Sequence, residues 1–174
     1  MILVIDTCKY HLHSSEFVKP ITDLIDDFTI KHFTKLKKED IEKADKIIIS
    51  GTALRDNEAR EHLEKFKWIK DFDKPLLGIC MGMQLIGQIH GAETYECPEI
   101  GPTEIILKET FPGIDQERFE AYALHDFAIK LPAGFQEIAK SNKCAQIIKK
   151  GNTYGILFHP EVMNKHIIAY FINQ

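Results

Sequence analysis

Leu76-Leu77-Gly78-Ile79-Cys80-Met81-Gly82-Met83-Gln84 is the most informative segment of this sequence. The apolar residues before Cys80 are typical of a buried strand, and residues 81–90 continue as a helix that a glycine closes. Gly78 and Gly82 lie two residues before and two residues after Cys80, where a Cβ atom would crowd a sharp turn. We therefore predict a strained strand-to-helix turn at the carboxyl end of a sheet, with a cysteine at its apex.

Short apolar runs alternate with amphipathic stretches on the N-terminal side of this turn. Continuous apolar runs predict buried strands, and apolar residues three or four positions apart predict helices. In chain order these patterns predict strands at residues 1–7, 29–34, 46–50 and 75–80, and helices at 17–28, 37–43, 57–72 and 81–90. This alternation favours a parallel sheet that is covered by helices on both faces.

The character of the chain changes after Gly91. Turn residues separate runs that predict strands at 103–108, 119–125, 135–141, 144–150 and 153–158, and residues 166–172 predict a closing helix. The predicted fold class is therefore α/β, with a mostly parallel sheet, helices on both faces and additional strands in the C-terminal half. Because we find no internal repeat, linker or low-complexity segment, we expect a single domain over residues 1–174.

Composition excludes several classes of protein. Of the 174 residues, 44% are hydrophobic and 28% are charged, a balance typical of a soluble globular protein. The net charge of −4 argues against nucleic-acid binding, which needs a positive surface. No apolar run approaches the length that spans a membrane. The four cysteines show no CxxC pair and no zinc-ligand spacing, so we expect reduced thiols and a cytoplasmic protein.

Cys80 is the candidate nucleophile of the chain. The amino end of a helix stabilises a thiolate, and the free backbone N–H of Met81 can donate to an oxyanion. A buried structural cysteine in a tight connection would show the same local sequence. Distinguishing the two requires a base, which need not be close to Cys80 in the sequence.

His159 is the histidine best placed to be that base. It follows a predicted strand, and Glu161 lies two residues further on, where its carboxylate can orient the imidazole. Both Cys80 and His159 are thus expected at strand ends. His11 and His13 form an HxH pair, but no further ligand lies at a supporting spacing, and we expect them in a loop.

Two motifs now resemble those of one family. Gly78-x-Cys80-x-Gly82-x-Gln84, followed by Phe158-His159-Pro160-Glu161-Val162, is similar to the signature of the class I, triad-type glutamine amidotransferases. The resemblance covers nearly the whole chain. It implies a flavodoxin-like fold and hydrolysis of L-glutamine, with Cys80 as nucleophile, His159 as base and then acid, and Glu161 as its orienting partner.

The resemblance also implies how substrate would be held. The oxyanion would be bound by the N–H of Met81 and by a loop at Gly51 and Thr52, while Gln84 would hold the amino-acid end of glutamine. The glutaminases of GMP synthetase, one branch of this family, usually carry Ser-Gly-Gly-Pro in this loop, whereas this chain has Ser50-Gly51-Thr52-Ala53. A β-branched residue such as Thr52 would hold a backbone conformation with positive φ poorly.

Two segments point to one branch of the family. Residues 131–144 and the tripeptide 99–101 resemble the glutaminase part of GMP synthetase, which in archaea is a separate subunit of similar size. That branch has a Ser-His-x-Asp segment, whereas this chain reads Leu124-His125-Asp126-Phe127. Subunits that serve anthranilate, aminodeoxychorismate or imidazole glycerol phosphate synthesis are alternatives within the family.

The acceptor of ammonia is expected on another polypeptide. The chain contains neither GxxxxGK[ST] nor GxGxxG, so the partner we expect is an ATP-dependent synthetase subunit of the ATP-pyrophosphatase type, with xanthosine monophosphate as the acceptor. Glutamine hydrolysis by a cysteine needs no metal and no organic cofactor. Two further alternatives are a stand-alone cysteine hydrolase of γ-glutamyl compounds and a binding module without enzymatic activity.

Overall fold

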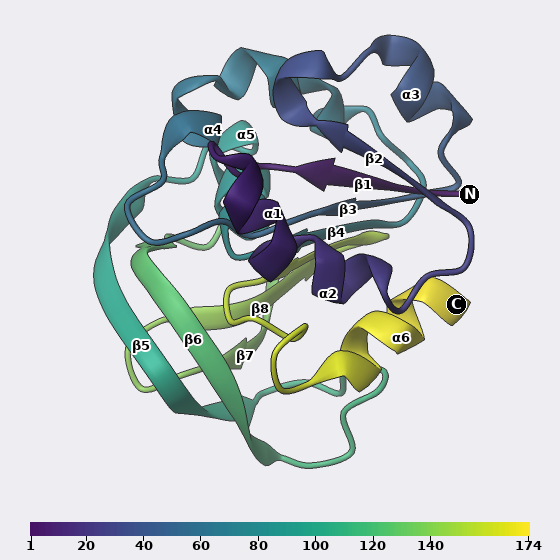
Figure 1. The fold of residues 1–174 in the computed structure, drawn as a ribbon. Coiled ribbons are helices and arrows are strands. Elements are labelled where there is room, and N and C mark those ends of the chain that lie inside the picture. Colours follow the sequence, from purple (N-terminus) through teal and green to yellow (C-terminus); the bar gives the residue numbers. More distant parts are fainter.

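A computed structural model describes residues 1–174, and one nine-stranded sheet runs through it (Figure 1). Five neighbouring strands are parallel, in the order β2-β1-β3-β4-β9. Their carboxyl ends meet at one edge of the sheet. The bounds are Ile2–Asp6 for β1, Phe28–His32 for β2, Lys46–Ile49 for β3, Leu76–Ile79 for β4 and Thr153–Ile156 for β9.

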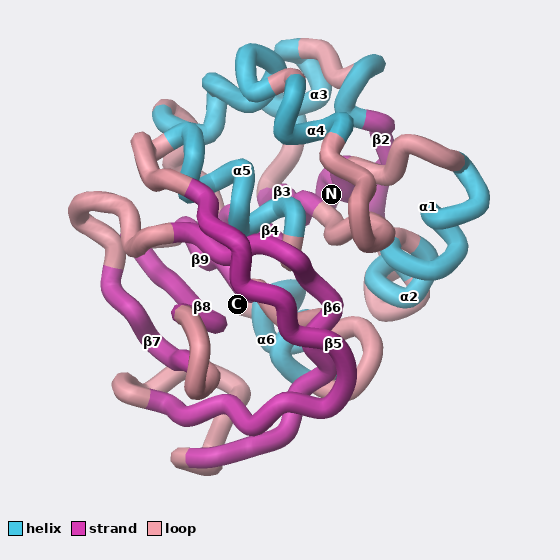
Figure 2. Tube along the Cα trace, turned by 90° about the vertical axis from the view of Figure 1, so that its left-hand side faces the viewer, coloured by secondary structure: helices cyan, strands magenta, loops and turns pink.

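Four antiparallel strands extend the sheet beyond β9, in the order β8-β7-β5-β6. They are β5 at Thr94–Leu107, β6 at Arg118–Ile129, β7 at Gln136–Lys140 and β8 at Ala145–Lys150. Figure 2 shows β5 and β6 as a long twisted pair beside the parallel strands. The fold is thus an α/β fold with additional C-terminal strands, as predicted.

Helices cover both faces of the parallel strands because these strands are apolar on both sides. In β1, Ile2 and Val4 belong to one apolar core, while Leu3 and Ile5 belong to the other. The first core packs under α1 (His11–Phe17), α2 (Lys19–Thr22) and α6 (Lys165–Asn173), and the second under α3 (Lys38–Lys43), α4 (Glu58–Glu61) and α5 (Met81–Ile89). No helix combines the length and the apolar character needed to cross a lipid bilayer.

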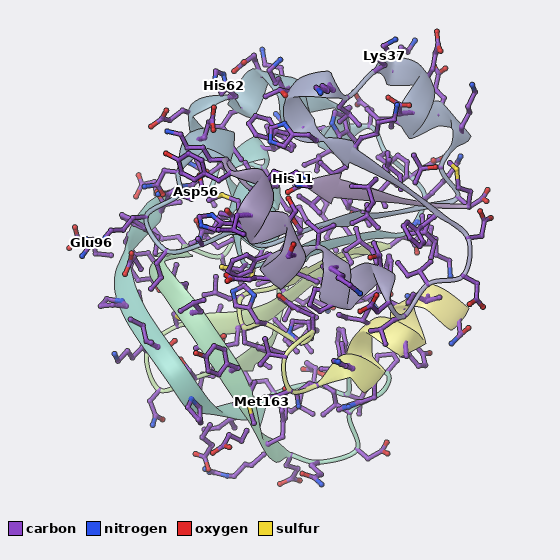
Figure 3. All side chains as sticks on the ribbon, viewed as in Figure 1. His11, Lys37, Asp56, His62, Glu96 and Met163 are labelled. Carbon is purple, nitrogen blue, oxygen red and sulfur yellow. The ribbon has the colours of Figure 1, made fainter.

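The helix predicted at 17–28 is wrong. The structure has α1 and α2 instead, and Pro20 lies in the first turn of α2, where its missing N–H costs no hydrogen bond. The chain then turns into β2, with the N–H of Ile2 bonded to the carbonyl of Asp27 at 2.9 Å. His11 and His13 lie in helix α1 and not in a loop; Figure 3 shows His11 on this helix.

The helix predicted at 57–72 is also different. It is divided at His62 into the short α4 and a 3₁₀ helix, η2, at Leu63–Lys70. Leu63, Phe66 and Ile69 are three residues apart, which places them on one side of a helix with three residues per turn. A second 3₁₀ helix, η1, covers Phe33–Lys35.

Strands β5 and β6 are longer than the predicted 103–108 and 119–125. The early part of β5 lacks apolar alternation in its sequence. Its backbone is also irregular, because Gly101 has a φ of 97° and the register with β6 shifts between Glu96 and Glu99. Hydrogen bonding to β6 nevertheless continues across it. Pairing with a neighbouring strand, which the apolar pattern does not report, therefore extends both strands.

Candidate active site

Cys80 occupies a strained position between β4 and α5. Its backbone has φ 47° and ψ −98°, and Arg55 is the other non-glycine residue with positive φ. The turn is as tight as the sequence predicts, because a Cβ at Gly78 would lie 2.5 Å from the carbonyl carbon of Gly82. Strain of this kind costs about 1–3 kcal/mol and is concentrated at functional sites.

Gly82 allows the turn to pack against the neighbouring strand, and this leads to a prediction about stability. In Gly82→Ala, the new Cβ would lie 2.5 Å from the carbonyl oxygen of Ile49 in β3, which is rigid backbone. We expect the free energy of unfolding in urea to fall by about 1–3 kcal/mol.

Gly87→Ala is the matched control for Gly82→Ala, since it lies in the same helix. A Cβ at Gly87 meets only the end of the Ile129 side chain, which can rotate. Alanine also favours the helix by about 1 kcal/mol over glycine, so we expect little loss of stability. Equal losses in the two variants would contradict this account of the turn.

The structure brings Cys80, His159 and Gly51 together from three strand ends. Each follows the carboxyl end of a parallel strand: β4, β9 and β3 respectively. A Cβ at Gly51 would lie 2.7 Å from Cε1 of His159 and 3.3 Å from the Cβ of Cys80, so glycine leaves the space that these two side chains occupy.

His159 is paired with Glu161 in a buried position. Its Nδ1 lies 2.7 Å from Oε1 of Glu161, and both side chains are about 1% exposed or less. Nε2 is buried and has no hydrogen-bond partner. Burial opposes a positive charge on the imidazole, but the Glu161 carboxylate and a Cys80 thiolate outweigh burial and raise the pKa of His159 well above its ordinary value.

The loop after β3 is held by its own side chains. The hydroxyl of Thr7 donates to the carbonyl of Gly51 at 3.1 Å, and the hydroxyl of Thr52 donates to Asp56 at 2.6 Å. The N–H of Thr52 makes no hydrogen bond. Thr52 does not have positive φ, which occurs instead at Arg55, where φ is 64°. The strain expected of a β-branched residue at position 52 is therefore not found in this structure.

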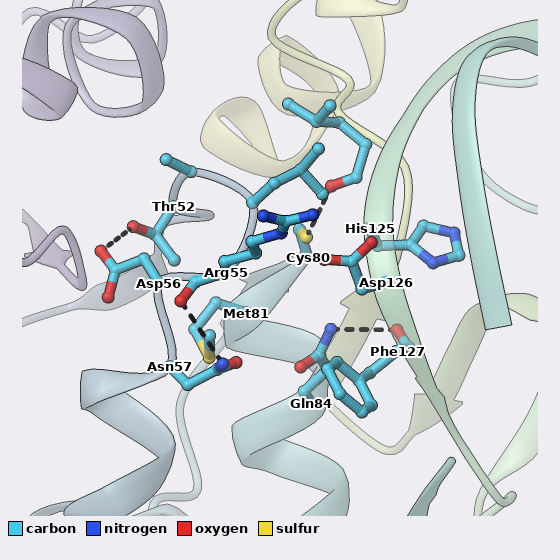
Figure 4. A pocket seen from close by; sticks show the side chains of 13 residues that line it. Thr52, Arg55, Asp56, Asn57, Cys80, Met81, Gln84, His125, Asp126 and Phe127 are labelled. Carbon is cyan, nitrogen blue, oxygen red and sulfur yellow. Dashed lines mark hydrogen bonds between the residues drawn. The ribbon is translucent and has the colours of Figure 1, made fainter. Parts of the chain in front are cut away.

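A small pocket lies above Cys80, between this loop and β6 (Figure 4). Thr52, Met81 and Gln84 line it together with Cys80, whereas Gly51 and His159 lie outside its lining. The Cys80 thiol lies 3.6 Å from the carbonyl oxygen of Leu124. The side-chain amide of Gln84 donates to the carbonyl of Phe127 at 3.1 Å, which joins helix α5 to the wall formed by β6.

Sequence reasoning missed two arginines near this pocket, of which Arg55 lines it and Arg60 lies behind Phe127. Figure 4 shows the guanidinium of Arg55 directed into the pocket near the Cys80 thiol, with the Asp126 carboxylate nearby. Arg60 lies 4.3 Å above the ring of Phe127, and burial lowers the pKa of its guanidinium. Composition was the signal that could have found them. The chain has three arginines in 174 residues, and two of them, Arg55 and Arg60, lie in or just after the loop that follows β3.

His125 lies at the back of the pocket wall. Its side chain is fully buried, and Figure 4 shows the ring directed away from the thiol of Cys80. Burial lowers the pKa of His125 in spite of the nearby carboxylate of Glu99, so that its imidazole is neutral at neutral pH.

Comparison with known families agrees with this geometry. The family model described as Glutamine amidotransferase class-I matches residues 20–173. This chain belongs to the class I glutamine amidotransferases. The amidotransferase is therefore a member of a family of glutamine-hydrolysing enzymes, and the resemblance seen in its motifs is confirmed.

Relatives of this amidotransferase serve more than one pathway. It is 29% identical to imidazole glycerol phosphate synthase subunit HisH 1 from Vibrio vulnificus, over 94% of this chain and 92% of the relative. It is 32% identical to a subunit of glutamine-hydrolysing GMP synthase from Archaeoglobus fulgidus, over 71% of this chain and 70% of the relative. A crystal structure from Thermoplasma acidophilum, provisionally described as a GMP synthase subunit, superimposes with a TM-score of 0.84 at 26% identity, covering 99% of this chain and 92% of that one.

Proposed function

We propose that the amidotransferase hydrolyses L-glutamine through a cysteinyl thioester, with Cys80 as nucleophile, His159 as general base and acid, and Glu161 as its orienting partner. The observation that carries this proposal is the meeting of Cys80 and His159 around Gly51, with Nδ1 of His159 bonded to Glu161 at 2.7 Å. A nucleophile, a base with a free Nε2 and an orienting carboxylate are the three parts of a catalytic triad.

The proposed reaction has two steps. The Cys80 thiolate bonds to the side-chain amide carbon of glutamine, and the N–H groups of Met81 and Thr52 stabilise the oxyanion. The C–N bond then breaks as His159 gives its proton to the leaving nitrogen, and ammonia departs. In the second step His159 takes a proton from water, which attacks the thioester and releases glutamate.

The pocket offers charged groups for the amino-acid end of glutamine. Arg55 would bind the α-carboxylate and Asp126 the α-ammonium, because the two lie in the pocket with opposite charges (Figure 4). Gln84 would complete this end of the site. The amide of Gln84 is held by Phe127 at 3.1 Å, which fixes its direction.

We further propose that ammonia passes to a separate ATP-dependent synthetase subunit of the ATP-pyrophosphatase type, and that xanthosine monophosphate is converted to GMP. The similarity to GMP synthase subunits supports this acceptor. The second candidate function is that of the glutaminase in imidazole glycerol phosphate synthase, which is supported by the relative that matches 94% of the chain.

The test is reconstitution with each candidate partner from the same organism. Glutamate release would be measured for the amidotransferase by itself, with the ATP-pyrophosphatase subunit plus ATP and xanthosine monophosphate, and with the other subunit of imidazole glycerol phosphate synthase plus its substrate. We expect stimulation of about tenfold or more with the first partner, corresponding to about 1.4 kcal/mol of coupling, and GMP formation that depends on glutamine.

Three outcomes of this reconstitution are informative. Stimulation by the other subunit of imidazole glycerol phosphate synthase, and not by the ATP-pyrophosphatase subunit, would favour the second candidate. Full activity of the isolated chain, unchanged by either partner, would indicate a stand-alone hydrolase of γ-glutamyl compounds. Absence of any glutamyl thioester under all three conditions would contradict the enzymatic proposal itself.

A further inference from the structure

A second group of chemically reactive side chains lies outside the catalytic pocket. Cys97 and Glu99 are on β5, and Cys144 lies in the turn between β7 and β8. The two sulfur atoms and a carboxylate oxygen all lie within 4.8 Å of one another, and each residue is 7% exposed. No step of glutamine hydrolysis uses any of them.

His125 reaches the same group from the neighbouring strand. It lies opposite Glu99 in the pairing of β5 with β6, and its Nε2 is 3.3 Å from Oε2 of Glu99. Its side chain has no exposed surface, yet neither ring nitrogen makes a hydrogen bond of acceptable geometry. A fully buried imidazole without hydrogen bonds is rare, because an unsatisfied polar group in the interior costs about 1–3 kcal/mol. Nε2, which faces Glu99 without a hydrogen bond, therefore points to a ligand at this place.

The spacing of these atoms fits a tetrahedral metal ion. With Zn–S distances near 2.3 Å and Zn–N or Zn–O distances near 2.0 Å, ligand atoms around one zinc ion lie about 3.3–3.8 Å apart. Oε2 of Glu99 is 3.3 Å from Sγ of Cys144 and 3.3 Å from Nε2 of His125. We propose that Cys97, Glu99 and Cys144 bind a structural zinc ion. Nε2 of His125 lies beside Glu99 but outside the group whose atoms are all within 4.8 Å of one another, so it would close on the ion as the fourth ligand when zinc binds.

Zinc binding would leave the net charge of this buried group unchanged. Before binding, the group carries one negative charge, on Glu99, and two neutral thiols. Binding replaces the two thiol protons by one Zn²⁺ and forms two Zn–S bonds, so the buried charge stays at −1. Two thiolates with one nitrogen and one oxygen ligand favour zinc over magnesium or calcium, which prefer oxygen ligands.

The surroundings supply the other parts of a metal site. The hydroxyl of Ser141 and the amide of Gln146 donate to Oε2 of Glu99, at 3.0 and 2.7 Å, and so orient the carboxylate. Cys144 and Ser141 also line an open cavity of about 550 Å³, which gives an ion a route from solvent. The site would tie β5, β6 and the β7–β8 turn together, directly behind the pocket wall at residues 124–127.

The first experiment measures metal content and coordination in the full chain. Protein purified without chelator or histidine tag would be analysed for zinc, and the metal-free protein would be titrated with Co²⁺. We expect about one zinc per chain and a near-ultraviolet charge-transfer band from thiolate to cobalt. Cys144→Ser should lose the band, whereas Cys8→Ser, which alters a buried free cysteine elsewhere, should keep it.

The second experiment needs no variant that could fail to fold. Native wild-type protein would be alkylated with and without Zn²⁺ and the labelled cysteines identified by mass spectrometry, with protection expected at Cys97 and Cys144 but not at Cys8. His125→Ala should weaken zinc binding by more than the roughly 10–100-fold that is typical of losing an outer-shell partner, because it removes a ligand. Absence of the cobalt band in folded wild type, a metal-free disulfide between Cys97 and Cys144, or a band that persists in Cys144→Ser would overturn the proposal.

Discussion

Replacement of Cys80 by alanine is expected to lower kcat for glutamine hydrolysis by about 10⁴–10⁶-fold, the effect of removing a nucleophile from a catalytic triad. The reason is that no other thiol lies in the pocket between the loop after β3 and β6. Glutamate release is the measurement, supported by mass spectrometry after treatment with a glutamine analogue that alkylates thiols. Labelling should occur at Cys80 alone.

Two variants separate loss of the nucleophile from loss of the fold. Cys80→Gly should fold at least as well as wild type, because glycine adopts a φ of 47° without strain, yet it should be equally inactive. Cys8→Ala should keep most activity. Cys8 also follows a parallel strand, but burial raises the pKa of its thiol, which leaves it protonated. Labelling mainly at Cys8, Cys97 or Cys144 would show that the nucleophile has been misassigned.

His159→Ala is the second change with a large expected effect, a loss of about 10⁴-fold or more in kcat. Both steps depend on the imidazole, which protonates the leaving nitrogen and then deprotonates water. Glu161→Gln should cost less, since it removes the charge but keeps a hydrogen-bond acceptor near Nδ1, where the carboxylate now lies at 2.7 Å. A larger loss in Glu161→Gln than in His159→Ala would reverse the roles proposed for the two residues.

The charge of His159 should also be visible in stability. Its pKa is raised in the folded protein by Glu161 and Cys80, against the opposing effect of burial. Folding therefore favours proton binding at this site, and its contribution is fully present below the unfolded value of about 6.5 and is lost as the pH rises through the folded value. Urea unfolding across this range should show stability falling with pH in wild type and a flatter profile in His159→Gln. Identical slopes would contradict a charged His159 in the folded state.

Features that depend on local sterics could be predicted from the sequence. Gly78 and Gly82 predict the tight turn at Cys80 because each removes a Cβ that would lie 2.5 Å from backbone. Apolar runs predicted the buried strands of the parallel sheet, and the order of the two motifs predicted the family. The spacing of apolar residues predicted helices less well where two short helices follow each other. Pro20 begins a separate helix, α2, and the apolar residues after His62 follow the three-residue spacing of the 3₁₀ helix η2.

Contacts between residues far apart in the sequence result from the way whole elements pack. His159 reaches Cys80 because β9 lies beside β4, a neighbour relation set by strand pairing and not by sequence distance. The direction of Arg55 depends on a backbone conformation that its own residue type does not favour. Cys97 and Cys144 showed no metal-ligand spacing along the chain, yet the pairing of β5 with β6 and β7 brings them to one buried carboxylate. Such contacts depend on the packing of whole elements, whereas a local sequence pattern reports only the shape of its own segment.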